Sequence, residues 1–253
     1  MSLRVVLFAN GPVGARAAQL VAADVGSEVV AVVVHPEARA RSRDEIVRAA
    51  GIGPERIFEG QNLQDERILA DIAALEPALG LSVYFGHILR APLLGLFPRG
   101  VVNLHPSLLP YNRGSYPNVW SIVDGTPAGA TLHYIDEGID TGDIIAQRRV
   151  EVSPSDTGGT LYAKLEEGAV ELLGETWPTI VAGTNRRTPQ LPGGTVHRMR
   201  DVETIDPIDL DGVVTARRLI DILRARTFAP HRGAYFVVDG VRVYLRLELT
   251  PEE

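Results

Sequence analysis

The chain has 253 residues and a formal net charge of −7 at pH 7, and its 45% hydrophobic and 23% charged residues are ordinary for a globular protein. It contains no cysteine, which excludes thiolate nucleophiles, disulfides, iron–sulfur clusters and cysteine-ligated zinc. Lys164 is its single lysine and lacks the Gly-Lys-Ser/Thr context of a phosphate-binding P-loop, and it leaves little room for Schiff-base chemistry.

Short β-branched runs alternate with amphipathic segments along most of the chain. In chain order this pattern predicts a strand at 4–9, a helix at 15–25, a strand at 29–34, helices at 44–50 and 63–75, a strand at 79–85, a short helix at 91–96, strands at 100–104, 130–135 and 144–152, and a helix at 160–173. The strand–helix–strand order predicts the α/β class, with a Rossmann-like, mostly parallel sheet and right-handed crossovers.

A polar, proline-bearing stretch at residues 183–192 precedes a Gly-Gly pair and predicts a boundary between two domains, 1–184 and 185–253. Beyond it, the pattern predicts a helix at 211–225 and a β-hairpin over 234–247 with an Asp-Gly turn. An appendage this small is expected to need the main domain or a second subunit to bury its apolar surface.

Charge is distributed unevenly along the chain. Residues 1–184 carry 14 basic and 22 acidic residues (14 − 22 = −8), whereas residues 185–253 carry 11 and 10 (11 − 10 = +1). Neither part has the basic excess typical of a nucleic-acid surface, so no nucleic-acid partner is expected. No apolar run approaches the ~20 residues that span a bilayer, and the N-terminus enters strand-like sequence directly. We therefore expect no membrane segment, no signal peptide and a cytoplasmic location.

A candidate chemical site lies where the strand at 100–104 ends. Asn103 and His105 are two residues apart, so an extended strand presents both to the same side, and Pro106 then stops the strand. Open α/β sheets bind ligands at this end of their strands. An amide can donate to a developing oxyanion, and an imidazole can donate or accept a proton near neutral pH. The pair fits acyl transfer, although an Asn-x-His at a strand end can also be structural.

An acidic loop, residues 136–143 (Asp-Glu-Gly-Ile-Asp-Thr-Gly-Asp), follows another predicted strand and offers Asp140 as a carboxylate to orient the imidazole. The same loop could instead be a solvated turn or a cation site, but its spacing does not fit an EF-hand, and no metal is expected. The remaining histidines lack metal-ligand spacing, and most of them are expected to be structural or solvent-exposed: His35, His87, His133, His197 and His231.

Three segments in this order resemble the folate-dependent formyltransferase family, and most closely its sugar N-formyltransferases. They are residues 84–89 (Tyr-Phe-Gly-His-Ile-Leu), 103–110 (Asn-Leu-His-Pro-Ser-Leu-Leu-Pro) and 136–143. The second and third are highly specific as a pair, and the resemblance covers roughly residues 1–180. It implies the formyltransferase fold with a small C-terminal helix and hairpin appended.

The resemblance implies formyl transfer from N10-formyltetrahydrofolate to an amine, without a metal. Asn103 and protonated His105 would stabilise the oxyanion of a tetrahedral intermediate, and Asp140 would favour the protonated imidazole and help move the proton. The residues expected to hold the folate come from two loops: Phe85, Gly86, His87, Ile88, Leu89, Asp136, Gly138 and Ile139. A related formimidoyl or hydroxymethyl donor stays open.

The formyl acceptor is expected to be an amino sugar linked to dTDP or UDP, because residues 111–120 resemble those of the sugar enzymes. The residues expected to bind this substrate are Asn10, Tyr116, Asn118, Trp120 and Tyr235, although Tyr116 and Trp120 could equally be core aromatics. In sugar enzymes of this type a C-terminal hairpin can form a dimer interface, so a homodimer is expected.

Three alternatives remain. Methionyl-tRNA is one acceptor, although the tRNA enzymes carry a larger, basic C-terminal domain. A purine precursor is disfavoured, because Pro12 removes a backbone donor from the first loop. A catalytically silent folate- or nucleotide-binding protein on the same scaffold is the alternative of another class.

Overall fold

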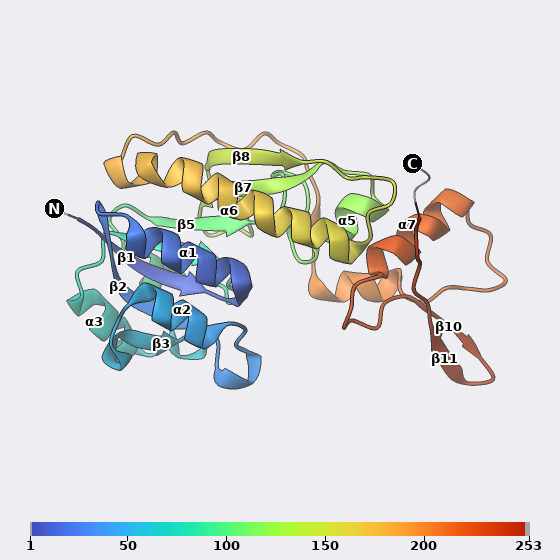
Figure 1. Ribbon diagram of the computed structural model, residues 1–253, viewed down its shortest axis with the longest axis horizontal. Coiled ribbons are helices and arrows are strands. Elements are labelled where there is room, and N and C mark those ends of the chain that lie inside the picture. Colours follow the sequence, from blue (N-terminus) through green and yellow to red (C-terminus); the bar gives the residue numbers. More distant parts are fainter. Residues whose placement is uncertain (1, 251–253) are drawn as a thin grey trace. The chain divides into compact units, whose positions relative to one another are not determined.

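A seven-stranded sheet dominates the computed structural model, which describes residues 2–250 (Figure 1). The strand order is β3-β2-β1-β4-β5-β7-β8. The first five strands in this order run parallel, and β7 is antiparallel to β5. The predicted α/β class and mostly parallel sheet are confirmed, as is the C-terminal hairpin.

The strands of the large sheet are β1 (Leu3–Ala9), β2 (Ser27–Val34), β3 (Ile57–Glu59), β4 (Leu79–Val83), β5 (Val101–His105), β7 (Ala128–Tyr134) and β8 (Ile144–Val150). Two small pairs are β6 (Arg113–Gly114) with β9 (Val196–His197) and β10 (Tyr235–Val238) with β11 (Val241–Tyr244). The α-helices are α1 (Gly11–Ala23), α2 (Arg43–Ala50), α3 (Glu66–Ala74), α4 (Ala91–Leu94), α5 (Pro117–Val123), α6 (Gly158–Ala182) and α7 (Ala216–Arg226).

Helices α1 and α7 begin at Gly11 and Ala216 rather than at the predicted residues 15 and 211. Helices α5 and α6 differ more, for physical reasons. Helix α5 is missing from the predicted elements. All of its residues are buried, so it has no exposed face and no amphipathic period that would reveal a helix. The predicted helix at 160–173 ends too early, since α6 continues through Gly174 and Pro178 to Ala182. Gly174 lies within the helix and packs near the side chain of Leu20, so this glycine does not end the helix.

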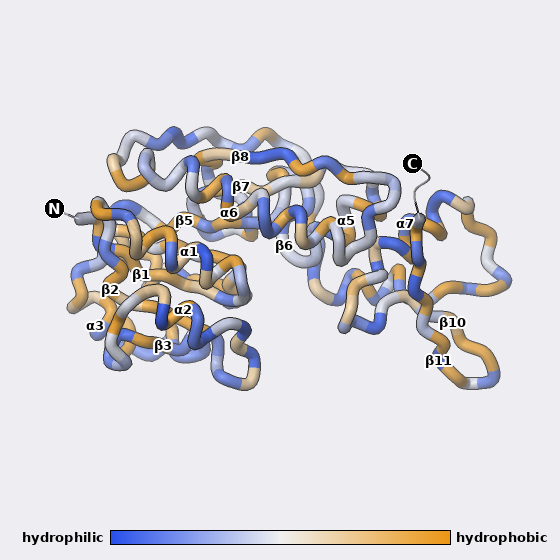
Figure 2. The backbone as a smooth tube through the Cα atoms, in the orientation of Figure 1, coloured by the Kyte–Doolittle hydropathy of each residue, from blue (hydrophilic) through white to orange (hydrophobic). Residues whose placement is uncertain are grey.

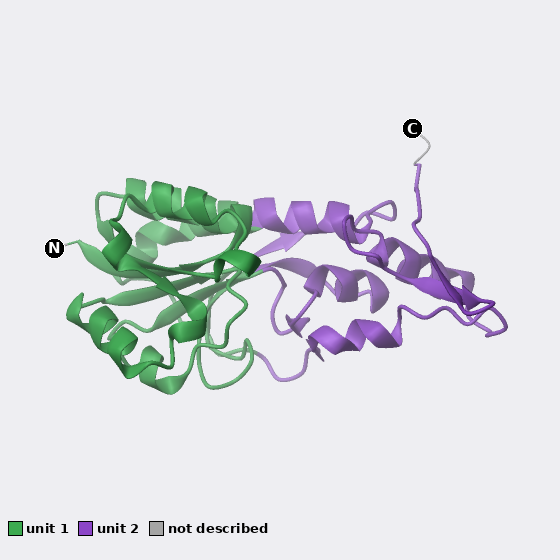
Figure 3. Ribbon diagram, turned by 90° about the horizontal axis from the view of Figure 1, so that it is seen from below, with its two compact units in different colours: residues 1–105, 131–147, 169–190 green, residues 106–130, 148–168, 191–253 purple. Residues whose placement is uncertain are grey.

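The described residues form two compact units (Figure 3). Unit 1 comprises the described residues up to His105, with Thr131–Gln147 and Ala169–Gln190. Unit 2 comprises Pro106–Ala130, Arg148–Gly168 and the described residues from Leu191 onward. The units therefore interleave along the sequence, and the predicted division into 1–184 and 185–253 stays a prediction.

Each unit has its own apolar core. In unit 1, residues of α3 and α4 such as Ile72 and Leu93 pack against β1 and β2, whose tubes are strongly hydrophobic in Figure 2. In unit 2, the core combines α5 with Leu161, Leu165 and Ile222. Among the described helices, none combines the length and the apolar composition that crossing a bilayer requires.

Candidate active site

Strand β5 brings Asn103 and His105 to one side of the sheet at its C-terminal end, as its alternation predicts. His105 is almost fully buried, with 6% of its surface exposed, and Asn103 is half-buried. The antiparallel neighbour β7 places His133 directly opposite Asn103 in the ladder. The strand pairing therefore gives Asn103 a buried polar neighbour that the local sequence does not reveal.

His133 is only 1% exposed and bonds at both ring nitrogens. Its Nδ1 lies 2.8 Å from the carbonyl oxygen of Tyr134, which can only accept, so Nδ1 carries the proton. In the neutral ring Nε2 is then an acceptor, and Asn103 Nδ2 donates to it at 3.1 Å. From the sequence, His133 is expected to be structural or solvent-exposed. In the structure it is buried and orients the amide of Asn103.

Asp140 completes the cluster from the loop after β7. Its Oδ1 accepts from Asn103 Nδ2 at 3.4 Å and lies 3.6 Å from His133 Nε2. Its Oδ2 lies 3.7 Å from His105 Nδ1, within ion-pair distance but too long for a strong hydrogen bond. An amide and an imidazole from one predicted segment and a carboxylate from another therefore converge in unit 1.

The loop that carries Asp140 has an irregular backbone held by its own side chains. Asp136 Oδ1 accepts from the Gly138 amide at 3.0 Å and from Thr141 Oγ1 at 2.6 Å. Asp140 has φ of +52°, in the left-handed region that is costly for a residue with a Cβ. At Gly142 an added Cβ would lie 1.9 Å from the carbonyl oxygen of Tyr134, so only glycine fits there.

The segment expected to hold one side of the folate is built around an aromatic cluster. The ring of Phe85 lies 5.0 Å from that of His35 and 5.2 Å from that of His87, and the two imidazoles are 4.7 Å apart. The Gly86 amide donates to His35 Nε2 at 3.3 Å. Gly60 packs directly beneath, since its added Cβ would lie 2.6 Å from Phe85 Cζ. Sequence reasoning identified Phe85, Gly86 and His87 but neither His35 nor Gly60.

Exposure divides the remaining residues expected at the folate. Ile88 is 72% exposed and Ile139 53% exposed, so both can contact a ligand. Asp136 and Gly138 are also exposed. Leu89 is only 6% exposed and belongs to the core of unit 1, where it packs rather than faces outward.

Of the residues expected to bind the substrate, only Asn10 belongs to unit 1. Its side-chain Oδ1 accepts from the backbone N–H of Arg41 at 2.9 Å. Its backbone N–H donates to the carbonyl of Val83 at 3.2 Å. Asn10 thus ties the loop after β1 to two other segments, and its contact with a substrate stays a prediction.

The other four belong to unit 2. Asn118 is 3% exposed and donates from Nδ2 to the Gly158 carbonyl at 2.9 Å. Trp120 is 5% exposed and stacks on His197 with ring centroids 4.1 Å apart. These two residues have packing roles, and their contact with a substrate stays a prediction.

Tyr116 and Tyr235 are more accessible. Tyr116 is half-buried and has φ of +58° just before α5. Tyr235 is half-buried in β10, beneath the guanidinium of Arg242, which lies 4.7 Å from the centre of its ring. A substrate role for either residue stays a prediction.

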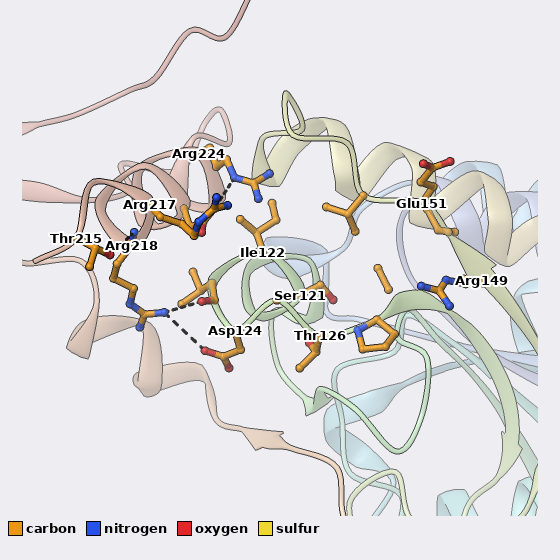
Figure 4. A pocket seen from close by; sticks show the side chains of 17 residues that line it. Ser121, Ile122, Asp124, Thr126, Arg149, Glu151, Thr215, Arg217, Arg218 and Arg224 are labelled. Atoms are coloured by element: carbon orange, nitrogen blue, oxygen red, sulfur yellow. Dashed lines mark hydrogen bonds and ion pairs between the residues drawn. The ribbon is translucent and has the colours of Figure 1, made fainter. Parts of the chain in front are cut away.

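Unit 2 also contains a pocket of about 740 Å³ between α5, β8 and α7 (Figure 4). Its charged lining residues are Arg149, Arg217, Arg218, Arg224, Asp124, Glu151 and Asp221. Arg218 donates to the Val123 carbonyl at 2.6 Å, and Arg224 pairs with Asp221 at 2.8 Å. Acidic side chains nearly balance the arginines, so the charge of this pocket selects no particular ligand.

The neighbouring imidazoles of His35 and His87 in unit 1 make the stability of the fold depend on pH. Burial lowers the pKa of His35 from 6.5, and the nearby His87 and Arg39 lower it further. The pKa of His87 is lowered by burial and by Arg39. Below about pH 6.5 these two histidines bind protons more readily in the unfolded chain than in the folded chain. The free energy of unfolding is therefore fully present above about pH 6.5 and falls as the pH drops below it.

We expect the melting temperature of the wild type to fall between pH 7.5 and pH 5.5, and His35→Gln to reduce this fall. The exposed His231, changed to Gln, is the matched control and should leave the fall unchanged. Differential scanning fluorimetry at the two pH values measures the effect. An equal fall in the His35→Gln variant would contradict the prediction.

Known proteins resemble this chain along most of its length. The family model described as "Formyl transferase" matches residues 3–176, and the one described as "N-formyltransferase dimerization C-terminal domain" matches residues 201–251. The dTDP-4-amino-4,6-dideoxyglucose formyltransferase of Mycobacterium tuberculosis is 37% identical over 153 residues, which are 60% of this chain and 65% of that protein. The chain thus covers slightly less than two-thirds of this relative.

A methionyl-tRNA formyltransferase of Anaeromyxobacter dehalogenans is 33% identical over 261 residues, covering 97% of this chain and 79% of that protein. Among solved structures, a 4-N formyltransferase from Francisella tularensis matches with a TM-score of 0.85, 28% identity and 98% coverage of both chains.

A formyltransferase from Anoxybacillus kamchatkensis, solved with UDP-4,6-dideoxy-4-formamido-L-AltNAc and tetrahydrofolate, matches with a TM-score of 0.56 and 28% identity. It covers 79% of this chain and 88% of its own. The resemblance that three short motifs predict is confirmed by a match over more than half of the chain and by the fold. The chain belongs to the formyl transferase family.

Proposed function

We propose that this protein is an enzyme that transfers a formyl group from N10-formyltetrahydrofolate to the amine of a nucleotide-linked amino sugar. One observation carries the proposal. The side chains of Asn103, His105 and Asp140 converge at the end of β5, with Asp140 within 3.4 Å of the first and 3.7 Å of the second. These groups suit acyl transfer and need no thiolate.

In the proposed reaction, the sugar amine attacks the formyl carbon, and the new C–N bond forms as the carbonyl oxygen becomes an oxyanion. The protonated imidazole of His105 donates to this oxyanion. Asn103 Nδ2 donates to it with the hydrogen that points to Asp140 at 3.4 Å in the free protein, while its other hydrogen stays on His133. Because His105 Nδ1 faces Asp140, Nε2 is the ring nitrogen assigned to the oxyanion. Collapse of the tetrahedral intermediate breaks the bond to N10, which takes up the proton that the amine loses.

Asp140 has two proposed roles. Its negative charge beside His105 favours the protonated imidazole, which is the form that donates to an oxyanion. The carboxylate is also the nearest base for the proton that the attacking amine loses. His133 helps to orient the cluster, because it holds the amide of Asn103 with an N–H toward Asp140.

The two loops expected at the folate support a formyl-carrying folate as donor. Exposed Ile88 and Ile139 provide apolar side chains, and the exposed loop at 136–139 provides backbone polar groups. The related structure solved with tetrahydrofolate supports the same class of co-substrate. Catalysis without a metal stays part of the proposal.

Relatives support an amino sugar more strongly than a tRNA as the acceptor. The mycobacterial relative is a formyltransferase of a dTDP-linked amino sugar, and the Francisella tularensis structure is a 4-N formyltransferase. The Anoxybacillus kamchatkensis structure contains a UDP-linked formamido sugar. The methionyl-tRNA relative keeps tRNA as the second candidate, with 33% identity over nearly the whole chain. The balance of +1 in residues 185–253 disfavours tRNA, which requires a strongly basic surface. Either dTDP or UDP is the proposed nucleotide.

A homodimer and a cytoplasmic location complete the proposal. Residues 201–251 match a dimerisation domain. Within it, the hairpin of β10 and β11 exposes four valines to solvent in the single chain, between 40% and 61% of each: Val237, Val238, Val241 and Val243. An apolar surface of this kind favours contact with a second copy.

Incubation with N10-formyltetrahydrofolate and a panel of dTDP- and UDP-linked amino sugars tests the acceptor. We expect at least one sugar to gain the mass of a formyl group. The parallel reaction with methionyl-tRNA is expected to give no product. Transfer to the tRNA and to none of the sugars would overturn the sugar assignment in favour of the second candidate.

His105→Ala is expected to lower kcat about 100-fold or more, because it removes a donor assigned to stabilise the oxyanion. The control is His231→Ala, which removes an exposed histidine outside the cluster. Steady-state kinetics of both variants provide the comparison. Wild-type turnover by His105→Ala would refute the catalytic assignment.

Val241→Glu is expected to weaken the dimer, because it places a charge on the apolar hairpin. Light scattering at micromolar concentration should show a wild-type dimer and a larger monomer fraction in the variant. Val25→Glu is the control, because Val25 is fully exposed and lies outside residues 201–251. A monomeric wild type would contradict the proposed assembly.

A further inference from the structure

Residues 185–190, expected from the sequence to be part of a domain linker, are bound along the segment that carries Asp140. We call these six residues the strap. At its centre, Thr188 and Ile144 form an isolated antiparallel bridge, with backbone hydrogen bonds of 2.8 Å and 2.9 Å. The bridge anchors the strap at the start of β8, directly after the Asp140 loop.

The first half of the strap holds the other end of the loop. Asn185 Nδ2 donates to the hydroxyl of Tyr134 at 3.0 Å. The guanidinium of Arg187 lies 3.7 Å from the centre of the Tyr134 ring and 3.7 Å from Asp143 Oδ2. The backbone N–H of Tyr134 also donates to the carbonyl of Asp143 at 2.9 Å, so both ends of the loop contact the strap.

Gln190 reaches the middle of the loop. Its Nε2 donates to the carbonyl of Asp140 at 2.8 Å and to the carbonyl of Gly142 at 2.9 Å. Carbonyl oxygens only accept, so the NH₂ end of the amide must face them, and its two hydrogens serve two acceptors. Both carbonyls belong to the positions with the most constrained backbone, Asp140 with φ of +52° and Gly142 with no room for a Cβ.

We propose that Gln190 is a positioning residue for the formyl transfer: its amide holds the carbonyls on both sides of Thr141, so that the Asp140 carboxylate faces Asn103 and His105. The inference rests on the proposed function for the roles of those three residues. Gln190 acts through the backbone of Asp140 and does not need to touch a substrate.

The geometry explains why the loop needs this support. A left-handed conformation at an aspartate is less stable than the right-handed one and persists only where surrounding contacts maintain it. The contacts inside the loop fix Asp136, Gly138 and Thr141. The carbonyls of Asp140 and Gly142 accept from Gln190, so this side chain adds a contact from outside the loop at its two most constrained positions.

Two substitutions separate this role from simple anchoring of the strap. Gln190→Met keeps the length of the side chain but removes both donors, and Gln190→Glu sets a carboxylate against two carbonyl oxygens. The matched control is Thr188→Val. Thr188 has an exposed side chain, and its bonds to Ile144 involve only the backbone, so the anchor remains.

Hydrogen–deuterium exchange of residues 136–143 and steady-state kinetics are measured on the full chain. For Gln190→Met we expect faster exchange in this loop and a fall in kcat of about 10- to 100-fold, because misplacement by about 1 Å can cost that much. The KM values should change less than kcat, and Gln190→Glu should be more severe. Thr188→Val should match the wild type in both measurements.

Unchanged exchange in Gln190→Met would overturn the inference, and so would faster exchange with an unchanged kcat. A variant that melts many degrees below the wild type would be compared at a lower temperature, where both are folded. A wild-type chain that transfers no formyl group would count against the proposed function. The exchange comparison would then decide separately whether Gln190 holds the loop.

Discussion

The antiparallel pairing of β5 with β7 is the constraint on which the site depends. On its other side, β5 pairs with β4 in the parallel direction. Strand β7 runs antiparallel to β5 and sets His133 directly opposite Asn103. Because the Tyr134 carbonyl accepts the Nδ1 proton of His133, Nε2 of the neutral ring accepts from the amide of Asn103. One strand register therefore determines how the half-buried amide of Asn103 is oriented.

A second constraint follows where β7 ends. The chain must turn immediately, since Tyr134 and Asp143 pair across the base of the loop. A loop this tight relies on a glycine without space for a side chain and on an aspartate in a left-handed conformation. The carboxylate reaches Asn103 and His105 because of this backbone, so its position depends on contacts that are outside the cluster itself.

The sequence predicts the parts of the site that follow from local pattern. Strand alternation and Pro106 identify Asn103 and His105, and a specific motif identifies Asp140. The role of His133 is not predicted, because the alternation within one strand does not show which residue of the neighbouring strand lies opposite Asn103. Gln190 escapes for a related reason, since its contact with Asp140 joins residues 50 positions apart.

The fold shows the same division between local and non-local information. Buried strands such as β1 and β2 are evident from continuous apolar runs. Helix α5 is hidden because all of its residues are buried, and its burial depends on α7 and other distant segments of unit 2. Asn118 and Trp120 lie on this helix and are buried with it, and their predicted contact with a substrate stays a prediction.

The strap also affects the order in which the site is assembled during translation. A ribosome releases the chain from its N-terminus, so Asn103, His105 and Asp140 emerge well before residues 185–190. Until Thr188 has paired with Ile144 and Gln190 has reached the carbonyls of the loop, Asp140 lacks these contacts. The nascent chain can therefore form most of its parallel strands early, while the geometry of its carboxylate is completed only after helix α6 has been synthesised.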